Sequence, residues 1–275
     1  MNQARTNPFP PILRGACLAL AACLLPLSAL DATAAGAAAR ATIAAGAMPV
    51  NTFIGTQDEG NTFPGASAPF GMIQVSPIAD HYAGYRYTDK KIRGFGHSFL
   101  SGAGYWEQGG QLSVLPVTGA IGPGGDFDTS KKGAFDHKKY AADYTHDGEV
   151  GEAGYYKVKL TSYGGITAEA TALTRAAAER YTYAPGTKTG HVLLNLGQAN
   201  ERHSVIGSEV KIVGERSVEG RIVTRSFCGG AKYTTWFRME FDQPSPGAAS
   251  GTTAPAGRTS TARASRARPS RTACG

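Results

Sequence analysis

The sequence predicts an all-β fold, an antiparallel β-sandwich that spans residues 48–242. Apolar and polar side chains alternate in short runs, as in YYKVKL at 155–160, which is the period of a strand with one buried and one solvated face. Turns that contain glycine or proline separate these runs at intervals of roughly ten residues, a spacing typical of sandwiches. No segment shows the apolar spacing of a long helix.

The second half of this domain gives the clearest strands. The runs at 155–162 and 166–173 predict a hairpin, because Tyr163-Gly164-Gly165 between them has the composition of a tight turn. Further strands are predicted at 179–183, 191–197, 208–214, 220–227 and 232–241.

The first half is less regular. Strands are predicted at 72–77 (MIQVSP) and 111–117 (QLSVLPV), whereas 79–110 and 122–147 are predicted as long loops. Long loops in a compact domain are usually functional or are ordered by a partner surface.

The N-terminus has the pattern of an export signal. Arg5 and Arg14 precede an apolar run at 16–30, and the small residues at 32–34 follow it. This pattern predicts a signal peptide over 1–35, a linker over 36–47, and a periplasmic or secreted product. No run is long enough to predict a membrane span.

A second interpretation of the leader is lipid anchoring. Leu20-Ala21-Ala22-Cys23 resembles a lipoprotein cleavage box, which would place a lipid on Cys23. The apolar run continues past Cys23, so we favour export without an anchor.

The C-terminal segment 243–275 is predicted to lie outside the fold. It contains no Val, Ile, Leu, Met, Phe, Tyr or Trp, and therefore cannot bury a core. We expect a low-complexity segment that is disordered or translated out of frame; its five arginines leave a nucleic-acid-binding tail as the alternative.

Without the segments 1–35 and 243–275, the formal charge of the chain falls from +7 to about +1, which argues against a nucleic-acid partner. Only Cys228 remains between them, so no internal disulfide is expected.

Catalytic and metal motifs are not found. Residues 126–130 open like a calcium loop, but Lys131 stands at the required glycine and His137 at the closing glutamate. The six histidines do not fall at a metal-ligand spacing. We therefore expect no metal site and no cofactor in this chain.

Three segments carry a family resemblance. Residues 50–77 (VNTFIGTQDEGNTFPGASAPFGMIQVSP), 83–105 (AGYRYTDKKIRGFGHSFLSGAGY) and 112–119 (LSVLPVTG) resemble the start of glycoside hydrolase family 92, the exo-acting α-mannosidases that trim mannose-rich N-glycans. The likeness continues more loosely to Pro244. It implies an N-terminal β-sandwich followed by an (α/α)6 domain that supplies Ca²⁺ and the carboxylates for general acid and base catalysis with inversion.

This resemblance implies that the catalytic residues and the Ca²⁺ belong to a C-terminal domain that this chain lacks. We expect an exported α-1,2-type mannosidase domain, inactive alone, with two partners: mannose-containing glycans and the missing (α/α)6 domain. In the family the loop at 58–63 approaches the terminal mannose, which makes Gly60 and Asn61 candidate substrate-binding residues. A turn glycine is an equal interpretation of Gly60.

Two aromatic residues complete the predicted sugar contacts. Tyr82 stands where many family members have a tryptophan that stacks on the sugar, and Trp106 could meet a glycan or the missing domain. Phe63 and Phe70 are expected to anchor the 51–71 segment to the core. An isolated sandwich domain should also expose an apolar patch where the second domain packs.

Two other functions remain open on the sequence. The first is a stand-alone carbohydrate-binding module that uses Tyr82, Tyr85 and Trp106. The second keeps catalysis inside this chain, with two facing carboxylates drawn from Asp58, Glu59, Asp80 and Glu107.

Overall fold

The computed structural model describes residues 50–81, 83–99, 109–128, 130–131, 136–198, 205–225, 231–245 and 247, and the backbone of 264–266. Regular structure in this part is almost entirely β, which confirms the predicted all-β class; the helix α2 is a single turn, His137–Tyr140. None of the described helical residues forms a segment long and apolar enough to cross a membrane.

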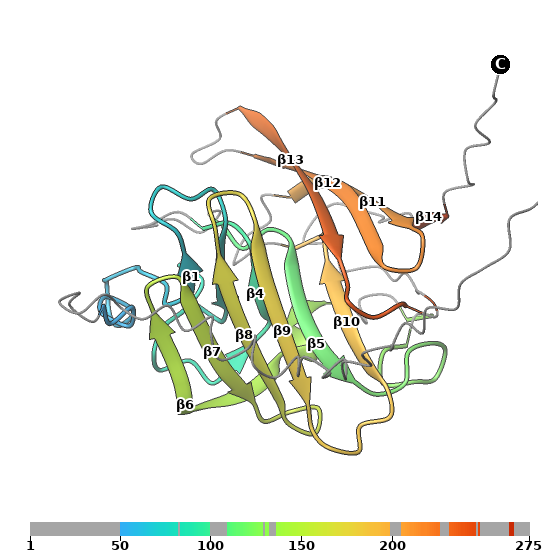
Figure 1. The fold of residues 1–275 in the computed structure, drawn as a ribbon, viewed down its shortest axis with the longest axis horizontal. Helices are drawn as coiled ribbons and strands as arrows, with labels where there is room; N and C mark the ends of the chain where they lie inside the picture. Colours follow the sequence, from blue (N-terminus) through green and yellow to red (C-terminus); the bar gives the residue numbers. More distant parts are fainter. Residues whose placement is uncertain are drawn as a thin grey trace, which may run out of the picture. The chain divides into compact units, whose positions relative to one another are not determined.

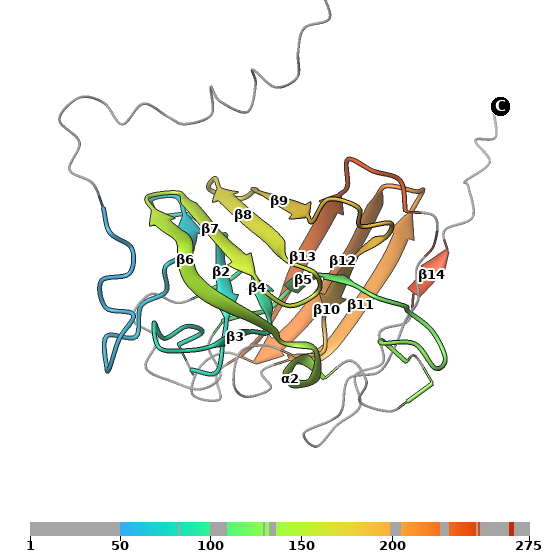
Figure 2. The same cartoon turned by 90° about the horizontal axis from the view of Figure 1, so that it is seen from below.

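Two five-stranded sheets form the sandwich (Figures 1 and 2). The first has the order β1-β2-β4-β5-β10, with bounds Ala66–Ser67, Gln74–Ile78, Gly94–Gly96, Ser113–Thr118 and Gly190–Asn195. The second has the order β3-β6-β7-β8-β9, with bounds Lys91–Ile92, Ala142–Glu152, Tyr155–Leu160, Ile166–Ala172 and Ala177–Tyr183. Every pairing within these two sheets is antiparallel.

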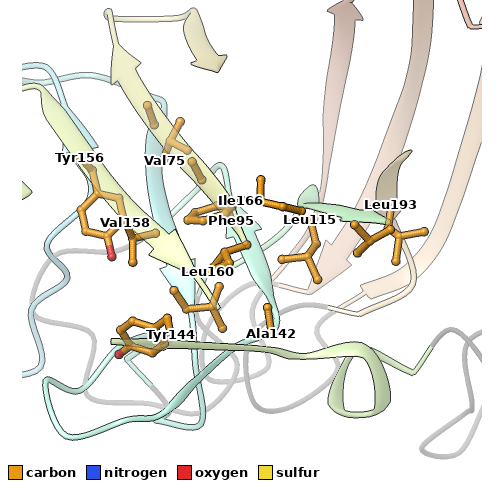
Figure 3. Close-up of a cluster of buried hydrophobic side chains, with 14 of the residues drawn as sticks. Val75, Phe95, Leu115, Ala142, Tyr144, Tyr156, Val158, Leu160, Ile166 and Leu193 are labelled. Carbon is orange, nitrogen blue, oxygen red and sulfur yellow. The ribbon is translucent and has the colours of Figure 1, made fainter. Parts of the chain in front are cut away.

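The main core lies between these two sheets. Alternate residues of β7 and β8 point inward, so Tyr156, Val158 and Leu160 are buried while the lysines between them are not. Figure 3 shows these side chains facing Val75 and Phe95 of the opposite sheet. The period of two in the sequence therefore corresponds to one buried sheet face.

The predicted hairpin between β7 and β8 is confirmed. Tyr163, Gly164 and Gly165 all have left-handed backbone angles, with φ of 59°, 80° and 88°. Glycine adopts this region without steric cost, which explains the Gly-Gly pair. Tyr163 tolerates it because its ring packs on the core and its hydroxyl donates to the Tyr140 carbonyl.

A four-stranded sheet of order β13-β12-β11-β14 follows in the chain. Its strands are β11 (Val205–Val213), β12 (Ser217–Arg225), β13 (Lys232–Glu240) and β14 (Ala264–Arg266), and β14 pairs parallel with β11. One face of this sheet packs on a second, smaller core that contains Leu112, Leu196, Val205 and Ile222. β10 contributes side chains to both cores, because Leu193 points into the sandwich and Leu194 packs on the smaller core.

The prediction of long loops in the first half is wrong in part. β3, β4, α2 and the start of β6 lie inside the ranges 79–110 and 122–147. β3 and β4 are too short to show a period, and β4 is the tripeptide Gly-Phe-Gly, whose residues are all buried. Its burial comes from the neighbouring strands β2 and β5, which the local sequence does not reveal.

Candidate sugar-binding loop

The loop 51–62 precedes the sandwich strands and closes on itself. The Thr62 amide donates to the Gly55 carbonyl over 3.1 Å, and the Thr62 hydroxyl donates to the Ile54 carbonyl over 2.9 Å. Within the loop, the Gly60 amide donates to the Gln57 carbonyl over 3.1 Å. The segment with Gly60 and Asn61 is therefore a fixed turn.

Gly60 is required by the packing of the loop on itself. A Cβ added at this position would lie 2.1 Å from the Gly55 carbonyl oxygen, far inside any real contact. The atoms in the way are backbone and cannot rotate aside. The interpretation of Gly60 as a turn glycine thus has a physical basis here, while its role toward a sugar stays a prediction.

Asn61 carries two unusual features at once. Its φ is 55°, and Asp58 in the same loop has a φ of 51°, so two non-glycine residues occupy the left-handed region. The Asn61 side-chain oxygen is buried and accepts no hydrogen bond from the described residues. A buried acceptor without a donor costs about 1–3 kcal/mol, and strain of this kind concentrates at functional sites.

The segment 84–89 holds this loop from one side. The Tyr87 amide donates to the Thr56 carbonyl over 2.9 Å, and the Arg86 guanidinium donates to the Asp58 carbonyl over 3.3 Å. The Arg86 amide in turn donates to the Asp89 carboxylate over 2.8 Å. Burial raises the pKa of Asp89 above its usual value.

A buried carboxylate binds side chains that contact or belong to the 84–89 segment. The side chain of Glu149 on β6 is 1% exposed and accepts hydrogen bonds from the hydroxyls of Tyr85 and Tyr156 and from Nδ1 of His146. The His146 ring stacks on Tyr87, with 3.9 Å between centroids and 7° between planes. Burial, reinforced by charged and polar neighbours, raises the pKa of Tyr85 and of Tyr156 well above 10. Both phenols therefore stay protonated and act as donors.

No sequence pattern pointed directly to Glu149. A register shift between Thr145 and Val150 interrupts the pairing of β6 with β7, and this irregularity turns Glu149 inward. The one local hint is Gly148, with a φ of 72°, because a glycine inside a strand pattern often marks a bulge.

Comparison with known families decides what this domain is. The family model described as the glycosyl hydrolase family 92 N-terminal domain matches residues 49–273. The chain belongs to glycosyl hydrolase family 92, as an N-terminal domain of that family. The matched range includes most of 243–275, and residues 264–266 pair with β11, so the domain boundary at 242 stays a prediction.

Related proteins of this family 92 domain are much longer than the chain. An uncharacterized secreted glycosidase of Arthroderma benhamiae is 30% identical over 137 residues, which are 49% of this chain and 17% of that protein. The family 92 α-mannosidase BT3965 from Bacteroides thetaiotaomicron, also solved in complex with mannoimidazole, has a TM-score of 0.60 at 28% identity. The match covers 71% of this chain and 26% of BT3965. The family 92 glycosyl hydrolase ccman5 has a TM-score of 0.55 at 29% identity, over 69% of this chain and 25% of that one.

The predicted aromatic contacts have different outcomes in the family 92 domain. Tyr82 and Trp106 lie outside the described residues. Tyr85 is only 1% exposed, so the idea that it forms an open sugar platform is wrong. Its ring is buried because the hydroxyl reaches the Glu149 carboxylate inside the sandwich.

The candidate acids do not form a recognisable catalytic centre in the described part of the family 92 domain. Asp58 and Glu59 are exposed on the loop, Asp80 lies 3.4 Å from the buried Arg93 guanidinium, and Glu107 lies outside the described residues. The described residues also contain no group of three His, Cys, Asp or Glu side chains that could hold a metal ion.

A pocket of about 370 Å³ lies away from this loop, between the 125–131 segment and α2. The carboxylates that line this pocket accept hydrogen bonds from nearby residues of the chain. Asp126 accepts from the Ala120 amide, and Asp128 accepts from the Ser130 amide and hydroxyl, which holds the pKa of Asp128 well below its usual value. These contacts fit a structural turn.

A second buried polar pair joins the two sheets of the sandwich. His97, just after β4, places Nε2 2.8 Å from the Glu179 carboxylate on β9, and its Nδ1 is 2.6 Å from the Leu112 carbonyl. Burial alone would lower the pKa of His97, but the charge and hydrogen bond of Glu179 outweigh burial and raise it.

The prediction that Phe70 anchors the 51–71 segment to the core is wrong. Phe63 packs on Phe99 as predicted, but Phe70 is fully exposed. It follows Pro69 in a turn closed by the Gly71 amide and the Ala68 carbonyl, and its φ of 54° turns the side chain away from the core. The Met72 amide donates to the Thr174 carbonyl over 2.7 Å, so the backbone of exposed Met72 lies beside the segment that carries exposed Leu173.

Proposed function

We propose that this family 92 domain is the sandwich half of an exported α-1,2-type mannosidase that removes terminal mannose from glycans. Alone it is inactive, because the acid, the base and the Ca²⁺ come from a C-terminal (α/α)6 domain. The observation that carries the proposal is Asn61, a left-handed residue whose buried side-chain oxygen accepts no hydrogen bond from the described residues. The complex of BT3965 with mannoimidazole supports a mannose-like ligand for the family site.

The division of work between the two domains follows from chemistry. Hydrolysis with inversion needs two carboxylates on opposite sides of the sugar, and of the candidate acids that the structure describes, Asp58 and Glu59 are exposed and Asp80 is paired with Arg93. Gly60 and Asn61, with Tyr82 and Trp106, contact the sugar and orient it. Glu149 and His146 act through Tyr87, since they fix the segment that holds the loop.

The second domain packs on the apolar group formed by Phe70, Met72 and Leu173. All three residues are exposed, and the backbone hydrogen bond between Met72 and Thr174 joins the two segments that carry them. A bulky residue with positive φ, such as Phe70, is strained, and such strain is retained where a surface is selected for binding. Solved relatives, of whose chains the match covers only 26% and 25%, provide the candidate partner, a further domain of the same polypeptide.

The test separates binding from catalysis. The purified chain is incubated with α-1,2-mannobiose, and we expect no released mannose; release would contradict the claim that it is inactive alone. Titration with the same sugar, followed by NMR of backbone amides, should move the signals of Gly60 and Asn61. Asn61→Ala should abolish these shifts, whereas Gln57→Ala, an exposed residue of the same loop, should keep them. Equal binding by both variants would refute the role of Asn61.

Export is tested on the mature product. The gene with its leader is expressed in a Gram-negative host, and the N-terminus of the periplasmic or secreted protein is sequenced. We expect a mature chain that starts near residue 36. A chain that begins at a lipid-modified Cys23 would instead show anchoring.

A further inference from the structure

The four-stranded sheet presents one face that the sandwich does not use. Phe237 and Met239 of β13 point to the smaller core with Ile222 of β12. The residues between them point to the opposite side. We call this side the outer face; its central members are Glu209, Lys211, Glu219, Arg221, Trp236, Arg238 and Glu240.

Trp236 is the unusual member of the outer face. It is 73% exposed, although tryptophan is highly buried on average. It lies on β13, which has β12 as its only neighbour among the described strands. The Arg221 guanidinium, directly across on β12, lies over the indole ring at 5.6 Å from its centroid, a cation–π contact.

The charges around Trp236 are paired with one another. Arg221 donates two hydrogen bonds to the Glu209 carboxylate. Glu219 lies between Lys211, at 3.2 Å, and Arg238, at 3.9 Å. Arg238 also contacts Glu240 at 2.7 Å. The centre of the outer face therefore has three cations and three carboxylates, while Arg225 and Lys232 lie at one end of the strands.

We propose that the outer face is a binding platform for a neutral oligosaccharide, with Trp236 as its stacking residue. The C–H groups on one side of a pyranose form an apolar surface that fits an exposed indole. The sugar hydroxyls meet carboxylate acceptors and guanidinium donors, and hydrogen bonds to charged groups are the stronger kind. Ion pairing holds these groups in place before the sugar arrives, which reduces the entropy lost on binding.

Other occupants fit less well. A polyanion or polycation would find no excess charge beside Trp236, because the three cations and three carboxylates there balance. A protein domain packed on this face would have to remove six charged groups from water, and the cores of protein interfaces are depleted of charged residues. An oligosaccharide leaves most of these groups hydrated. The platform is separate from the Asn61 loop, and it rests on the proposed function only for the choice of mannose as the first probe.

The experiment uses the two tryptophans of the chain, Trp106 and Trp236. In the Trp106→Phe variant of the full chain, Trp236 is the only tryptophan and reports on its own surroundings. Addition of α-1,6-linked mannohexaose should shift its emission to shorter wavelength in a saturable manner. Calorimetry should then show affinity that is about tenfold weaker in Trp236→Ala and largely retained in Trp236→Phe, since tenfold is a modest loss for one contact.

Each outcome of these titrations supports or contradicts the binding platform. An unchanged affinity in Trp236→Ala, or the absence of any response to mannohexaose and to cellohexaose, overturns the platform. A response to a heparin hexasaccharide in place of both neutral sugars also overturns it. A response to cellohexaose alone supports the platform and contradicts mannose only as the ligand of this platform. Binding that persists in Asn61→Ala shows that the platform acts independently of the loop.

Discussion

Replacement of Glu149 by leucine tests the buried network under the candidate loop. The change removes the acceptor of two fully buried phenols, Tyr85 and Tyr156, and of the His146 ring nitrogen. A buried donor that loses its partner costs about 1–3 kcal/mol, so the two phenols alone predict a loss of about 2–6 kcal/mol in the free energy of unfolding. Single domains have only about 5–15 kcal/mol in total, so the variant should be severely destabilised.

Urea unfolding, followed by tryptophan fluorescence and by circular dichroism, measures this loss. Glu152→Leu is the matched control, because Glu152 is an exposed residue at the end of the same strand; we expect a change within about 0.5 kcal/mol. Glu149→Gln keeps one acceptor oxygen and should lie between the two. A loss below about 1 kcal/mol in Glu149→Leu would refute the reasoning, because it would mean that the phenols find water or other partners.

Three further predictions concern other parts of the chain. The raised pKa of His97 means that its buried ion pair stabilises the fold fully below about pH 6.5 and less as pH rises through the folded pKa, so urea midpoints should fall from about pH 5 to about pH 9 in the native chain but not in His97→Gln. Gly60→Ala should cost about 1–3 kcal/mol because its Cβ meets backbone, whereas Gly207→Ala, with open space around it, should cost less than about 1 kcal/mol; equal effects in urea unfolding would contradict the packing argument. The double variant Phe70→Ser with Leu173→Ser should bind less hydrophobic dye than the native chain at an unchanged melting temperature, and an unchanged dye signal would argue against an apolar docking surface there.

Much of the fold was predictable from local sequence, for identifiable reasons. β7 and β8 are long and half-buried, so their side chains alternate strictly, and Gly164-Gly165 marks the turn. β3 and β4 were missed because two or three residues show no period, and because their burial is imposed by neighbouring strands. Phe70 was placed in the core by its hydrophobicity, but a positive φ in a turn decides its direction.

The candidate site was predictable only where residues carry a family pattern. Gly60 and Asn61 belong to such a pattern, and the structure adds why the first is a glycine and what is unusual about the second. Glu149 was not predictable, because its inward orientation depends on the register shift between Thr145 and Val150. A shift of this kind exchanges the two faces of a strand, and no local composition specifies it.

The sequence by itself determined the all-β class, most strands of the second half and the membership of family 92. These depend on side-chain period, turn residues and short motifs, which are properties of neighbours along the chain. Only the tertiary structure decided that Tyr85 is a buried donor to Glu149, that Phe70 is exposed, and that Trp236 stands among paired charges. These depend on which strands pair and in which register, because contacts between distant residues fix burial and hydrogen bonding.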